Sequence, residues 1–63
     1  MMTKAFLDEW IHSVEAAGGR ANTLVCSPWD VAFIEPLLAA YPLTLRVDDG
    51  CAPQMAYLYW EES

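Results

Sequence analysis

The chain has 63 residues, of which 56% are hydrophobic, and nine acidic residues against three basic ones give a net charge of −6 with the histidine neutral. This length leaves room for one hydrophobic core, so we expect a single domain over residues 1–63. The acidic balance argues against direct nucleic-acid binding, whose affinity comes largely from Lys and Arg neutralising phosphates, and favours a protein partner with a basic surface.

The first predicted element is an amphipathic helix over residues 3–17, because apolar residues recur along it at helical spacing. Thr3 is placed to cap its N-terminus, and Gly18-Gly19 supplies the left-handed stop that a helix C-terminus prefers. A short, β-branched, apolar run at residues 22–26 then predicts a buried strand. The apolar positions of the helix are Phe6, Leu7, Trp10, Ile11, Val14 and Ala17.

A second helix start follows this strand. Ser27 is placed to cap it, Pro28 occupies the first helical position, and Asp30 stands where a carboxylate reaches back to the cap. The apolar face continues to Tyr41. Pro36 removes an internal hydrogen bond, so we expect a kink or a restart of the helix there.

Two strands complete the chain. Leu43, Leu45 and Val47 alternate with polar residues, as in a strand with one buried face. Residues 48–50 have turn chemistry, and the aromatic residues 55–60 predict a last strand, antiparallel beside its predecessor or between the other two. The sequence therefore predicts an α+β fold: a two-layer α/β sandwich of order α-β-α-β-β, with a three-stranded mixed sheet and both helices on one face.

Such a fold leaves the second face of the sheet in water. We expect Tyr57 and Tyr59, with Met55, on this outer face, because the polar tip of tyrosine tolerates solvent. An open aromatic face is suited to docking or to forming the seam of a homodimer. The plainer alternative is that the two rings lie over Thr44 and Arg46 within a monomer.

No residue pattern predicts catalysis, a metal site or a cofactor. His12 is the only histidine, and the adjacent Ser13 points in another direction from a helix. A structural zinc site needs four paired Cys or His ligands, and the chain lacks them. Cys26 and Cys51 are expected as buried thiols, with a disulfide as the alternative, because no export signal precedes them. We expect a cytoplasmic protein without enzyme activity or a membrane span.

The acidic residues form the candidate binding surface. Carboxylates on a rigid scaffold can occupy Lys and Arg side chains that otherwise hold phosphates. Solubility alone is the plainer explanation for most of them. Partner contact is predicted for the carboxylates of Asp8, Glu9, Glu15, Glu35, Asp48, Asp49, Glu61 and Glu62, and for the aromatic rings of Tyr57 and Tyr59.

In size, acidity, aromatic content and lack of an enzyme motif, and in the compact run TLVCSPWD at residues 23–30, the chain resembles the small phage-encoded anti-CRISPR proteins, including those acting on type I systems. The resemblance implies a non-enzymatic inhibitor in the host cytoplasm. It implies that the chain binds a basic surface of a CRISPR effector (Cascade) complex and blocks the binding of target DNA by acidic DNA mimicry. No functional residue carries over, because those proteins share a role rather than a sequence. The alternative is a self-associating structural or adaptor module that uses the open aromatic sheet face.

Overall fold

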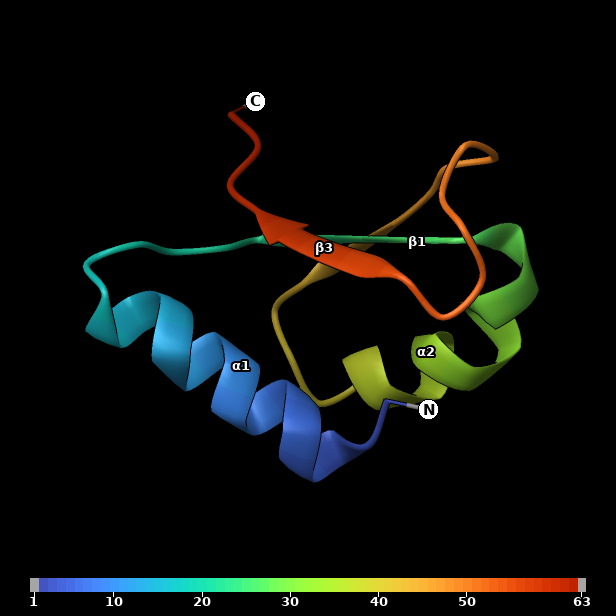
Figure 1. The fold of residues 1–63 in the computed structure, drawn as a ribbon. Coiled ribbons are helices and arrows are strands. Elements are labelled where there is room, and N and C mark those ends of the chain that lie inside the picture. The colour runs from blue at the N-terminus through green and yellow to red at the C-terminus, as the bar shows by residue number, and fades with distance from the viewer. Residues whose placement is uncertain (1, 63) are drawn as a thin grey trace.

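Two helices lie on one face of a three-stranded sheet in the computed structural model, which describes residues 2–62 (Figure 1). This architecture confirms the predicted α+β fold and its order α-β-α-β-β. No helix within the described residues is long and apolar enough to cross a membrane. The elements are α1 (Lys4–Ala16), β1 (Thr23–Cys26), the 3₁₀ helix η1 (Pro28–Asp30), α2 (Val31–Leu38), β2 (Thr44–Val47) and β3 (Ala56–Tyr59).

The ends of α1 are fixed by the residues that the sequence indicates. The Thr3 hydroxyl accepts a hydrogen bond from the Phe6 N–H at 3.1 Å, which is N-cap geometry. At the other end Gly18 has a φ of 85°, a left-handed conformation that glycine adopts without steric cost. Its N–H donates to the Glu15 carbonyl. The predicted helix is therefore confirmed to within one residue at each end.

β1 is the central strand of the sheet, whose order is β2-β1-β3. It pairs in parallel with β2 and antiparallel with β3. The predicted place of β3, beside β2 or between β1 and β2, is wrong. The connection over residues 48–55 passes the end of β1 and brings β3 to the far edge (Figure 1). This order gives the most buried strand a hydrogen-bonding neighbour on both sides, which satisfies its backbone groups.

The hydrophobic core fills the space between the sheet and the helices. The inner face of β1 contributes the centre of the core, and apolar side chains from both helices pack against it. Cys51 is also buried, and both cysteines are free thiols. Burial raises the pKa of the Cys26 thiol above its usual 9.0, so this group stays protonated. The buried cluster consists of Leu7, Leu24, Cys26, Ile34 and Leu38.

Two local predictions need correction. Of the kink or restart predicted at Pro36, the restart is wrong, because α2 continues through Pro36 to Leu38. The carbonyl that loses its partner belongs to Ala32, and both residues are exposed, so water can satisfy it. Val47 was expected on the buried face but is 47% exposed, because it is the last residue of an edge strand.

Ser27 provides a direct test of the predicted helix start. Its side chain is fully buried, and its Oγ accepts a hydrogen bond from the Trp29 N–H at 3.1 Å. We expect Ser27→Ala to lower the free energy of unfolding by about 1 kcal/mol, the usual cost of losing an N-cap. Urea unfolding followed by circular dichroism measures this loss. The control, Ser13→Ala on the exposed side of α1, should change stability by less than about 0.5 kcal/mol. Equal stability of the two variants would rule out the cap.

Candidate functional site

The structure divides the eight candidate carboxylates between the two sides of the molecule. One group lies in the helical layer. The other follows β2 and β3, where the loop and the C-terminal segment rise on the side of the sheet away from the helices (Figure 1). We call them the helical acids (Asp8, Glu9, Glu15, Glu35) and the loop acids (Asp48, Asp49, Glu61, Glu62).

All three basic side chains are engaged within the chain. The Lys4 Nζ lies 3.4 Å from Asp8 Oδ2, and the Arg46 Nη1 lies 3.1 Å from Glu61 Oε1. The third basic residue is Arg20, whose guanidinium carbon lies over the Trp60 ring at 4.1 Å from the ring centroid. The other candidate carboxylates are exposed and make no ion pair within residues 2–62; they are Glu9, Glu15, Glu35, Asp48, Asp49 and Glu62.

Asp8 differs from the other helical acids because it joins α1 to the segment after α2. The Tyr41 hydroxyl donates a hydrogen bond to Asp8 Oδ1, and the Lys4 ammonium donates to Oδ2. The Tyr41 hydrogen bond, followed by the Lys4 contacts, holds the pKa of Asp8 below its usual 3.8. The same hydrogen bond raises the pKa of Tyr41 above 10.0. The Asp8 carboxylate is therefore less available to a partner protein than the unpaired carboxylates.

This contact predicts a pH-dependent effect of Tyr41→Phe. The folded pKa of Asp8 is lowered, so its contribution to stability is complete above about pH 4 and is lost as the pH falls through the folded pKa. The folded pKa of Tyr41 is raised, so its contribution is complete below about pH 10 and is lost as the pH rises through the folded value. The parent should therefore exceed Tyr41→Phe in stability most clearly between these limits.

Urea unfolding at a series of pH values measures the difference. Tyr57→Phe is the matched control, because the Tyr57 side chain is exposed and makes no hydrogen bond within the described residues. A stability difference for Tyr41→Phe that stays constant into the acid range would contradict the role of Asp8.

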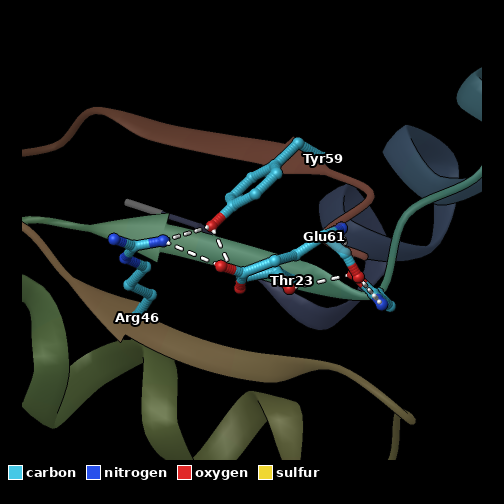
Figure 2. A network of polar contacts seen from close by, with 5 residues as sticks. Thr23, Arg46, Tyr59 and Glu61 are labelled. Carbon is cyan, nitrogen blue, oxygen red and sulfur yellow. Dashed lines mark hydrogen bonds and ion pairs between the residues drawn. The ribbon is translucent and has the colours of Figure 1, made fainter. Parts of the chain in front are cut away.

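A polar network covers part of the outer sheet face (Figure 2). Arg46 of β2 reaches across the central strand, and its Nη1 donates to the Tyr59 hydroxyl at 3.0 Å and to Glu61 Oε1 at 3.1 Å. The Asn22 Oδ1 accepts the Glu61 N–H at 2.8 Å and the Thr23 hydroxyl at 2.9 Å. Thr23 is only 2% exposed. The outer face is therefore partly closed by hydrogen bonds within one chain.

The two aromatic candidates consequently differ. Tyr59 is half-buried and held over the sheet by Arg46, one of the two residues over which the alternative predicted from the sequence places the tyrosine rings. Tyr57 is 54% exposed and remains available for contact. Met55 is predicted beside the two tyrosines on the outer sheet face. In the structure it lies instead on the helical side of the sheet, near Phe6 and Trp10 of α1 and Phe33 of α2. It precedes β3 and follows Gln54, whose φ of 65° turns the chain, so the alternation of a strand does not extend to it.

An apolar groove that was not predicted from the sequence lies between α1, α2 and the segment before β3. Its volume is about 450 Å³. Phe6 and Trp10 of α1 line one side, with ring centroids 6.0 Å apart in an edge-to-face arrangement. Phe33 of α2 and Met55 line other parts of it. A signal for the groove does exist in the sequence, because the apolar stripe of α1 is two rows wide. Of this stripe only Leu7 is fully buried.

Asp30 is a charged residue at this groove. The sequence predicts that its carboxylate caps the helix start, but Oδ2 instead accepts the Gln54 N–H at 2.7 Å. The carboxylate thereby holds the turn before β3 against η1. This contact fixes the groove wall formed by Gln54 and Met55.

The residues considered for chemistry are not brought together. His12 and Ser13 are exposed on α1, whereas Cys26 is buried on the inner face of β1. Within residues 2–62 no group of three or more His, Cys, Asp or Glu could hold a metal ion. Comparison of the chain with protein-family models, curated protein sequences and solved structures finds no match.

Proposed function

We propose that the chain is a non-enzymatic protein-binding inhibitor that covers a basic, nucleic-acid-binding surface of another protein. The proposal is supported by which charged side chains are paired within the chain and which are not. Each basic side chain is engaged internally, while six exposed carboxylates, from Glu9 to Glu62, make no ion pair within residues 2–62. Such a surface attracts clusters of Lys and Arg and accelerates association with them.

The fixed backbone positions of several carboxylates support binding beyond mere solubility. Glu9 and Glu15 are held on a helix that is capped at its N-terminus. In the loop, Asp48 Oδ1 accepts the Gly50 N–H at 2.9 Å, which fixes that side chain. Charges that are already ordered lose less conformational entropy when a partner binds. Such preorganisation favours mimicry of the phosphates of nucleic acid.

The first partner to test is a type I CRISPR effector complex in the cytoplasm of the host cell, because of the resemblance to phage-encoded anti-CRISPR proteins. The experiment measures target DNA binding by the purified complex in an electrophoretic mobility assay. We expect the chain, added before the DNA, to prevent binding at about one chain per basic site, and to act less when added after the DNA. Unchanged DNA binding in molar excess of the chain would contradict this choice of partner.

The alternative, self-association through the outer sheet face, has less support. The polar network of Arg46, Tyr59 and Glu61 occupies this face, and burying it in a dimer removes charged groups from water. Each copy also carries a net charge of −6, which opposes association of like chains.

A further inference from the structure

The apolar groove exposes side chains that the core does not use. Leu7 and Ile34, one from each helix, are buried against the sheet. Phe6 and Phe33, each one residue earlier, are 54% exposed, and Met55 is 48% exposed. A monomer of this size seldom leaves several large apolar side chains together in water unless they form a contact surface.

The charges around the groove are acidic. Within the described residues, Asp30 is the one charged side chain that lines it. Glu9 is exposed and lies three residues after Phe6 and one before Trp10, so it borders the same side of α1. Lys4, Arg20 and Arg46 do not line it. An apolar floor with an acidic border is complementary to apolar side chains flanked by cations.

We propose that this groove binds a peptide segment of a partner protein that carries large apolar side chains flanked by Lys or Arg. Its volume of about 450 Å³ is enough for a few side chains, as in other compact binding sites. A second copy of the chain is a poor occupant, because a symmetric contact brings the acidic Asp30 and Glu9 of both copies into one interface. The inference deepens the proposed function by adding a second contact surface for the partner.

Its test uses isolated peptides, so that it can fail separately from the inhibitor role. The probe is a fluorescein-labelled helical peptide of about 15 residues composed of Leu and Lys, with Leu at i, i+3, i+4 and i+7. One control peptide replaces each Leu with Ser, and another replaces each Lys with Glu. Fluorescence anisotropy measures binding to the parent chain and to three variants, Phe6→Ala, Phe33→Ala and Tyr57→Ala, whose circular dichroism confirms folding.

We expect the parent to bind the Leu/Lys peptide and to discriminate against both control peptides. Phe6→Ala and Phe33→Ala should each weaken binding about tenfold, as for the truncation of an anchor side chain. Tyr57→Ala should bind like the parent; Tyr57 is the matched control because it is equally exposed, at 54%, on the opposite face. In amide NMR spectra of the parent chain, the peptide should shift the signals of residues 6, 33 and 55 rather than the signal of residue 57.

Four results would overturn the inference. The first two are binding of the Ser/Lys peptide as tightly as the Leu/Lys peptide, which means that charge alone acts, and binding of the Leu/Glu peptide as tightly as the Leu/Lys peptide. The other two are no binding of the Leu/Lys peptide, and a loss of affinity with Tyr57→Ala as large as that with Phe33→Ala. Light scattering adds one more outcome. A dimer of the parent that Phe33→Ala dissociates would assign the groove to a second copy of the chain.

Discussion

Leu24→Ala is expected to lower the free energy of unfolding by about 2–5 kcal/mol, the range for truncating a buried leucine. Leu24 is fully buried at the middle of the core, and it stands in register with Leu45 and Leu58 on the neighbouring strands. Strands on both sides prevent the backbone from closing the resulting cavity. A single core in a domain of this size rarely supplies more than about 3–5 kcal/mol, so much of the variant should be unfolded at room temperature.

Urea unfolding followed by tryptophan fluorescence and circular dichroism measures this loss. Val47→Ala is the control, because it is also an apolar truncation in the sheet but at a side chain that is 47% exposed. It should cost well under 1 kcal/mol, or about the usual effect of a surface substitution. If Leu24→Ala is as stable as Val47→Ala, the core does not lie where the structure places it.

The second large effect concerns the exposed carboxylates. The double variant Glu9→Lys with Glu15→Lys changes the helical acids, and Asp48→Lys with Asp49→Lys changes the loop acids. We expect one of the two to lose affinity for the partner by about a hundredfold, because it places like charges opposite each other in the interface. The other should bind nearly as the parent does, because a docking surface is local.

The two double variants form a matched pair. Each substitution adds two positive charges, so both variants have a net charge of −2 in place of −6, and total charge cannot explain a difference between them. Asp8 is left unchanged, because Tyr41 and Lys4 use its carboxylate within the fold. The exposed substitutions should alter stability by less than about 0.5 kcal/mol each. An equal loss of affinity in both variants would indicate an effect of overall charge. No loss of affinity in either variant would show that these carboxylates do not contact the partner.

Local signals in the sequence predict the elements of this fold well. Thr3 and Gly18 mark the ends of α1, and Ser27 followed by Pro28 marks the next helical start, because each satisfies or relieves a particular backbone group. The predicted outward position of Tyr57 and Tyr59 places Leu58, between them, on the inner face, as observed. These features depend on neighbouring residues alone, and a single sequence contains them.

The order of the strands and the groove depend on how distant segments pack, and the sequence predicts them less well. β3 takes the far edge of β1 because the connection over residues 48–55 is long enough to pass the strand end. Met55 then faces the helices after the turn at Gln54. Phe6 and Trp10 are predicted as part of one amphipathic face, and only the position of α2 shows that both residues line a groove.

We propose that the carboxylates cover a surface of the partner protein that otherwise binds nucleic acid. Capture of proteins from a bacterial lysate on the immobilised chain, followed by elution with double-stranded DNA, tests this proposal. We predict that the captured partner is released by excess DNA and by raised salt, since screening shortens the reach of exposed charges. We also predict that one of the two double Lys variants does not capture it. Capture of nothing, or of a protein that neither DNA nor salt displaces, would contradict the account.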